Sequence, residues 1–171
     1  MPDRPAAGHL GHRTSWIRAC ALAFLALVLA PVGPLLAAAD AAAERAAIEQ
    51  VVTDAYVDGV HNFRDPAAMR RGFHPDFEML VLREGQLVKV TLAKWIEGME
   101  ARNLKEPPPK LSPGAPRATT AKFAAVEITG TAATCKVEVW RDGKQLFTDY
   151  LALYRFADGW KIVSKTFFSH S

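Results

Sequence analysis

Three tight turns divide the C-terminal third of the chain into four runs of strand-forming residues. The turns fall at Gly130-Thr131, Asp142-Gly143 and Asp158-Gly159. An Asp-Gly pair between two apolar-patterned runs favours a β-hairpin, because type I′ turns require positive φ angles that Gly adopts at little cost. The sequence therefore predicts four consecutive antiparallel strands, over Thr120–Thr129, Ala133–Arg141, Gln145–Phe156 and Trp160–Phe168.

The preceding segment carries helical periodicity. Apolar residues at 3.6-residue spacing predict a helix over Ala41–Gly59 with Asp40 as its N-cap, and Asp65-Pro66 begins a short helix ending near Arg71. A third helix is predicted over Leu92–Arg102. Two short strands, Phe77–Leu82 and Leu87–Val90, lie between the second and third helices. Helices grouped before an antiparallel sheet indicate an α+β fold, in which the helices cover the sheet.

A proline-rich stretch over Lys105–Arg117 joins the last helix to the sheet. It holds five prolines, so it is predicted to be extended and exposed. A connection of this length either borders a functional opening or is a plain crossover. The sequence leaves both alternatives open.

Residues 1–39 have the composition of an export signal. Arg13 and Arg18 lie in a polar region before an apolar run over Ala19–Ala30, and prolines and alanines follow it. This pattern is typical of a secretory signal peptide, and the run is about half of the ~20 residues that a membrane anchor needs. We expect cleavage near Ala39, a mature domain over residues 40–171 without a membrane association, and a periplasmic or secreted location. The rival interpretation is an uncleaved membrane anchor.

Charge and cysteine content exclude some classes of function and of covalent cross-link. The formal charge is +3, of which the first 39 residues contribute +2 through three arginines and one aspartate. The remainder is nearly neutral and mixed in sign, so a nucleic-acid-binding role is not expected. Cys20 lies in the predicted signal, which leaves Cys135 alone in the mature chain and excludes an internal disulfide. On an apolar strand face, Cys135 is predicted to be a buried hydrophobic residue rather than a reactive thiol.

Four segments of the mature chain together carry a family resemblance. They are Tyr56–Gly59, Phe73–Pro75, Thr148–Leu153 and Gly159–Lys165. They resemble the putative lumazine-binding family, within the nuclear transport factor 2-like group that also holds SnoaL-like and ketosteroid isomerase-like proteins. The resemblance covers roughly Ile48 to Phe168. It implies a cone-shaped α+β fold, with three N-terminal helices on a curved antiparallel sheet around a pocket, often in a homodimer.

Helix residues supply the first candidates for ligand binding. Tyr56, on the apolar helix face, either directs its hydroxyl into the pocket or bonds it to backbone. Trp95 either lines the pocket or fills the core. Asp58 is a pocket carboxylate or a cap for the following turn. His74, between Phe73 and Pro75, is a base or a fixed structural donor. His61 is expected at the surface or rim.

The third strand of the predicted sheet supplies the remaining candidates, Asp149 and Tyr150, on opposite faces. A carboxylate in an apolar cavity acts as a general base or a neutral donor because burial raises its pKa. The alternative is a structural Asp149 that pairs with Lys165 or Arg155. Strand alternation also predicts that Lys161 and Lys165 lie, with Glu138, on a solvated face. Both faces of this strand are largely apolar, which predicts a homodimer through the sheet.

Three functions fit this pattern. The first is an exported domain that binds a small, largely apolar molecule. The second is an enzyme of isomerase, dehydratase or cyclase type with Asp149 or His74 as proton carrier. The third is a dimeric structural or interaction module whose interior is filled by side chains. No cofactor or metal is expected, because the sequence has no phosphate loop, dinucleotide fingerprint or zinc motif.

Overall fold

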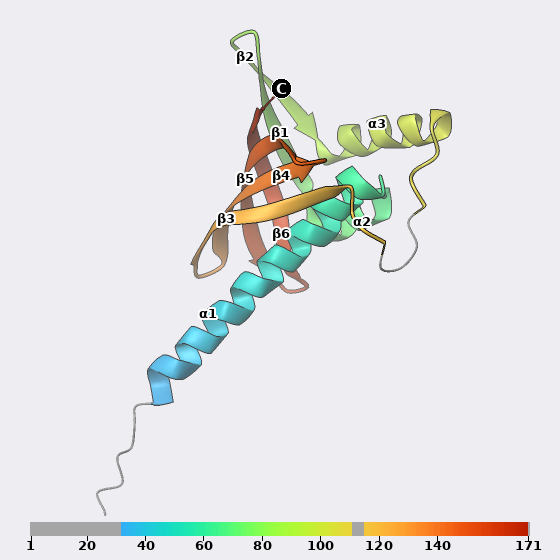
Figure 1. The fold of residues 1–171 in the computed structure, drawn as a ribbon. Coiled ribbons are helices and arrows are strands. Elements are labelled where there is room, and N and C mark those ends of the chain that lie inside the picture. The colour runs from blue at the N-terminus through green and yellow to red at the C-terminus, as the bar shows by residue number, and fades with distance from the viewer. Residues whose placement is uncertain (1–31, 111–114, 171) are drawn as a thin grey trace, which may run out of the picture. The chain divides into compact units, whose positions relative to one another are not determined.

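The computed structural model describes residues 32–110 and 115–170 (Figure 1). Most of the predicted signal peptide, including its basic flank and apolar run, lies outside the described residues. Among the described helices, none combines the length and apolar character required to cross a membrane.

A single six-stranded sheet forms the framework of the domain (Figure 1). Its order is β2-β1-β6-β5-β4-β3, and neighbouring strands are antiparallel except β1 and β6, which are parallel. The sheet confirms the predicted four-strand meander and the predicted hairpin before it. The strands are β1 (Phe73–Arg83), β2 (Gln86–Thr91), β3 (Thr119–Thr129), β4 (Ala132–Arg141), β5 (Lys144–Phe156) and β6 (Gly159–Ser169).

Helices precede and interrupt the strands as the α+β prediction requires. They are α1 (Val32–Val51), the π-helix η1 (Val52–Asn62), α2 (Pro66–Gly72) and α3 (Leu92–Lys105). Side-chain caps begin two of them: Asp65 accepts a hydrogen bond from the Ala67 amide, and Thr91 accepts one from the Lys94 amide. Helices α2 and α3 contact β1, and η1 contacts the start of the meander at β3.

The first helix begins earlier than predicted. Asp40 is not an N-cap, because α1 starts at Val32 and Asp40 lies inside it. The alanine-rich sequence before Asp40 has high helix propensity, which carries the helix through this point. Pro34 is tolerated because it lies in the first turn, where its missing N–H would have no intrahelical acceptor.

The end of the first helical segment is wider than an α-helix. From Val52 to Asn62 the backbone forms i→i+5 hydrogen bonds, and the same spacing closes the segment, with the Phe63 amide donating to the Asp58 carbonyl at 2.8 Å. In an α-helix, residues five positions apart project about 140° away from each other. The wider turn brings such residues back to nearly the same face.

Bulges bend the sheet and change which residues face the helices. Register shifts occur between Phe123 and Ala125, between Val139 and Trp140, and next to Leu153. At the last of these, Ala152 pairs with Ser164 and Leu153 pairs with Ile162, so Val163 is an extra residue between the two partners. After this bulge, Lys165 faces the same side as Ile162. The expectation that Lys165 lies on the solvated face is therefore wrong.

The core fills the space between this sheet face and the helices. Tyr56, Phe73, Phe77, Ile162 and Met69 are among its fully buried side chains. Close approach at α2 requires a glycine, because a Cβ on Gly72 would lie 2.3 Å from the Ala55 Cβ. Cys135 is buried in the same core, as predicted, and burial raises the pKa of its thiol to about 12.

Candidate ligand cavity

A cavity of about 870 Å³ remains between the sheet and the helices. Its deep part consists of buried or half-buried residues from η1, α3 and the central strands, and its rim consists of exposed side chains from β1, α3 and the proline-rich connection. The deep part includes Tyr56, Trp95, Met99, Phe147, Lys165 and Phe167. The rim includes Arg83, Lys94, Arg102, Glu106 and Pro109. A cavity of this size accommodates a drug-sized molecule.

Three polar side chains form a closed network at the inner end of the cavity. The Tyr56 hydroxyl donates to Asp149 Oδ2 at 2.7 Å and accepts from Lys165 Nζ at 2.7 Å. Lys165 Nζ also lies 2.6 Å from Asp149 Oδ1. All three side chains are buried, and the opposite charges of Asp149 and Lys165 compensate each other. Tyr56 and Lys165 line the cavity, whereas Asp149 lies behind them.

Aromatic rings enclose the Lys165 ammonium. Its Nζ lies 4.5 Å from the ring centroids of both Tyr56 and Phe167, with Phe147 and Trp95 slightly farther away. The negative faces of such rings stabilise a desolvated cation. Burial nevertheless lowers the pKa of Lys165, and the Asp149 charge opposes this shift. Burial, followed by the nearby Asp149 carboxylate, raises the pKa of Tyr56 well above its usual value.

His61 lies beside this network as a neutral imidazole. Its ring packs edge-on against Tyr56, with centroids 4.9 Å apart, and near Phe147. Burial, together with the charges of Lys165 and Arg141, lowers its pKa from 6.5 to about 3. Its Nε2 is covered and has no hydrogen-bond partner among the described residues. Tyr56 lies five residues before His61 in the chain, and the widened turn of η1 places both residues on the same side of the helix.

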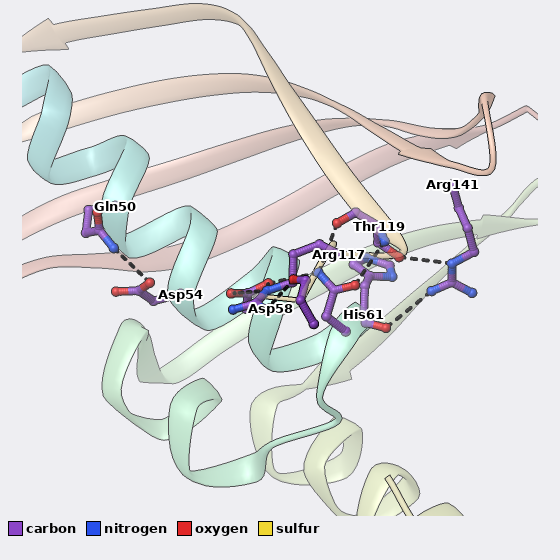
Figure 2. A network of polar contacts seen from close by, with 9 residues as sticks. Gln50, Asp54, Asp58, His61, Arg117, Thr119 and Arg141 are labelled. Carbon is purple, nitrogen blue, oxygen red and sulfur yellow. Dashed lines mark hydrogen bonds and ion pairs between the residues drawn. The ribbon is translucent and has the colours of Figure 1, made fainter. Parts of the chain in front are cut away.

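A second polar network includes two residues that line the cavity, Asn62 and Arg141 (Figure 2). Asn62, at the end of η1, exchanges two hydrogen bonds of 2.9 Å with the backbone of Thr119, where β3 begins. Arg141, at the end of β4, donates from Nε to the Thr119 hydroxyl at 2.9 Å and from Nη2 to the His61 carbonyl at 3.2 Å. These bonds join three elements and hold the Arg141 guanidinium in place.

Of the six predicted ligand-binding residues, Tyr56 and Trp95 line the cavity. Asp149 contacts it only through Tyr56 and Lys165. Asp58 instead accepts a hydrogen bond from Asn62 and pairs with Arg117 at 3.1 Å. His74 stacks on Phe156 and accepts a hydrogen bond from the Asp76 amide.

Tyr150 is on the opposite sheet face and is half-exposed, beneath the Lys136 ammonium. Among residues that sequence reasoning did not assign to the site, Lys165, His61 and Arg141 are the most prominent. Regular α-helical periodicity places His61 away from the site, and regular strand alternation does the same for Lys165. No sequence signal distinguishes Arg141 from other arginines at strand ends.

The arrangement offers a cavity whose deep part is largely apolar and whose rim carries charged side chains. Within the described segments, no group of three or more His, Cys, Asp or Glu side chains could hold a metal ion. The carboxylate nearest the inner end of the cavity is engaged by two partners, and the cavity-lining histidine is neutral. These properties suit the enclosure of a molecule better than the transfer of a proton.

Comparisons with solved structures agree with this architecture. A nuclear transport factor 2-like protein of unknown function from Shewanella baltica matches with a TM-score of 0.58 and 22% identity, over 76% of this chain and 96% of the other. A nuclear transport factor 2-like protein of unknown function from Silicibacter pomeroyi matches with a TM-score of 0.57 and 21% identity, over 78% of this chain and 98% of the other. A third such protein, from Methylobacillus flagellatus, matches with a TM-score of 0.54 and 20% identity, over 75% of this chain and 94% of the other. At these identities the likeness establishes the fold.

A search of curated proteins finds no match. The family comparison is more informative, because the putative lumazine-binding family matches residues 43–168. This range contains every helix and strand from the second half of α1 to the end of β6, apart from the last residue of the sheet. The chain therefore belongs to the putative lumazine-binding family and has the nuclear transport factor 2-like fold.

Proposed function

We propose that this protein is an exported domain that binds a small, largely apolar molecule in the cavity between sheet and helices. The observation that carries the proposal is the cavity of about 870 Å³, whose deep part is formed mostly by aromatic and aliphatic side chains. The family's description as lumazine-binding supports a small-molecule ligand without identifying it. Export rests on the sequence pattern of residues 1–39.

An isomerase, dehydratase or cyclase activity is less favoured. Such chemistry needs a base within hydrogen-bond reach of the substrate and a donor for the developing oxyanion. Of the two proton carriers considered from the sequence, Asp149 is screened from the cavity by Tyr56 and Lys165, and His74 is not among its lining residues. A purely structural module is also less favoured, because side chains leave this volume open.

The binding proposal predicts that filling the cavity abolishes binding. Gly98, on α3, lines the cavity, and a Cβ added there meets no atom within 4 Å. We expect Gly98→Phe to fold normally and to weaken binding of the neutral fluorescent probe N-phenyl-1-naphthylamine by at least about tenfold, a loss of roughly 1.4 kcal/mol. The measurement is probe fluorescence titrated with protein.

Gly98→Ala is the matched control. Alanine stabilises a helix by roughly 0.5–1 kcal/mol relative to glycine and takes little volume, so it should raise thermal stability and retain probe binding. If the wild-type protein fails to bind the probe, and native mass spectrometry of protein purified from its source finds no retained molecule, the binding proposal is wrong. If Gly98→Phe binds as tightly as Gly98→Ala, the probe occupies a different site.

A further inference from the structure

The residues that line the cavity have an excess of positive charge. Six of them are cationic and one, Glu106, is acidic. The cations are Arg64, Arg83, Lys94, Arg102, Arg141 and Lys165. His61 adds no charge near neutral pH, since its pKa is about 3. Lys165 and Lys94 are paired with carboxylates outside the lining, Asp149 and Glu97. The other four cations still outnumber Glu106, so the cavity lies in a positive environment although the mature chain as a whole is nearly neutral.

Three of these cations are buried or half-buried, and two of the three have a carboxylate partner. Lys165 pairs with Asp149 at 2.6 Å, and Arg64 lies 3.4 Å from Glu106 while also donating to the Pro107 carbonyl. Arg141 differs, because no carboxylate of the described residues lies within 4.0 Å of it. Both of its hydrogen bonds are to neutral oxygens, the Thr119 hydroxyl and the His61 carbonyl.

The geometry of Arg141 suits recognition of an anion. Its Nε and Nη2 are fixed by two different elements, and Nη1 makes no hydrogen bond to the described residues (Figure 2). Thr119 is held in turn by both amide atoms of Asn62. A guanidinium held in this way loses little side-chain entropy when it pairs with an oxyanion.

From this arrangement we propose that the ligand is an amphipathic anion, whose carboxylate or similar oxyanion pairs with Arg141 while its apolar body occupies the space beside Tyr56 and Trp95. This inference rests on the proposed binding function. The exposed cations of the rim attract the anion, and the closed Tyr56–Asp149–Lys165 network contributes a neutral wall. A neutral apolar molecule of the same shape binds more weakly because it leaves Arg141 without a counter-charge.

The test compares two probes that differ in charge and little in shape, 2-naphthoate and 2-naphthalenemethanol. Each is used to displace N-phenyl-1-naphthylamine from the wild-type protein at pH 7.5. We expect the carboxylate to bind roughly tenfold more tightly than the alcohol, in keeping with a hydrogen bond to a charged group. Arg141→Met should remove this preference and leave binding of the alcohol unchanged.

Two further variants sharpen the comparison. Lys122→Met removes an exposed cation that does not line the cavity and should leave the preference for the carboxylate unchanged. Arg141→Lys keeps the charge but not the two anchoring hydrogen bonds, so it should retain part of the preference. If Arg141→Met fails to fold, added NaCl serves instead. Salt should weaken binding of the carboxylate to the wild-type protein and leave that of the alcohol nearly unchanged.

The outcomes separate this inference from the function on which it rests. Absence of binding by the neutral fluorescent probe, together with the absence of any retained molecule in native mass spectrometry, would refute the binding function itself. Probe binding with equal displacement by both naphthalenes, or with displacement by neither, would overturn the anion site and leave a neutral ligand for the cavity. A preference for the carboxylate that persists unchanged in Arg141→Met would assign the anion to another cation.

Discussion

The buried pair of Asp149 and Lys165 ties the stability of the domain to two side chains that cannot be removed separately. Asp149→Asn leaves the Lys165 ammonium buried without a counter-charge, and Lys165→Met leaves the Asp149 carboxylate buried without one. Each single change should lower the free energy of unfolding by about 3–5 kcal/mol. The double variant should be less destabilised than the sum of the two, because it buries no net charge.

Urea denaturation of the wild type, the two single variants and the double variant gives the coupling energy between Asp149 and Lys165. We expect it to exceed about 1 kcal/mol, since the two groups are in contact and share the Tyr56 hydroxyl. Arg155 pairs with Glu44 on the surface, so Arg155→Met with Glu44→Gln is a control pair that should show coupling within the range of exposed ion pairs, about 0–1 kcal/mol. Additive effects at Asp149 and Lys165 would contradict the buried ion pair.

His61 gives the domain a stability that depends on acid pH. Its pKa is about 3 when folded and near 6.5 when unfolded, so between these values the unfolded chain binds the extra proton. Stability should therefore fall as the pH is lowered from 6.5 towards 3, by at most about 1.4 kcal/mol per pH unit. Chemical denaturation at pH 7.0 and 5.0 measures this loss.

In His61→Gln, the loss between these two pH values should become smaller, because glutamine does not titrate. His170→Gln is the control, since His170 is exposed and should leave the loss unchanged. Equal pH dependence of the wild type and His61→Gln would show that His61 is not buried as a neutral group.

Individual residues were predictable where one simple pattern decides them. Cys135 and Tyr56 follow strand and helix periodicity into the core, and the pairing of Asp149 with Lys165 was one of two alternatives that the sequence offered. Lys165 was also expected on the solvated face, because the extra residue Val163 is invisible to a period of two. His61 was not assigned to the site because the helix changes there from α to π spacing, which a period of 3.6 residues does not predict.

At the scale of elements, turn chemistry was the most reliable guide. Gly130 and Gly143 have the positive φ values that their turns require, and so does Asp142. The ends of the first helix were less predictable, since Asp40 satisfies the pattern of an N-cap although the alanines before it continue the helix. At Asp40 the helix propensity of the alanines on both sides outweighs the cap signal.

Irregularities within the elements also build the cavity. The wide turns of η1 bring Tyr56 and His61 together, and the bulge in β6 directs Lys165 towards them. Regular elements of the same length would place both His61 and Lys165 elsewhere. The sequence could therefore predict that a helix-covered sheet has a hollow, whereas the polar groups that line it depend on deviations from regular geometry.

At the scale of the whole molecule, the outer face of the sheet is the feature that most needs a partner. It exposes a group of large apolar side chains from β5 and β6, with exposed fractions of 52% for Tyr150, 50% for Tyr154, 38% for Phe156 and 63% for Phe168. Phe168 pairs with Thr148, two residues before Tyr150 on β5, so Phe168 and Tyr150 are diagonal neighbours on this face. A patch of this kind usually marks an interface.

We predict that this surface joins two copies of the chain about a two-fold axis, since a single self-complementary patch suffices for a symmetric dimer. Tyr150→Glu with Phe168→Glu should convert the dimer to a monomer in sedimentation equilibrium at micromolar concentration, because it would bury carboxylates in the interface. Leu104→Glu is the matched control. Leu104 is 89% exposed on α3, so its replacement should leave the mass unchanged. A monomeric wild-type protein would contradict the prediction.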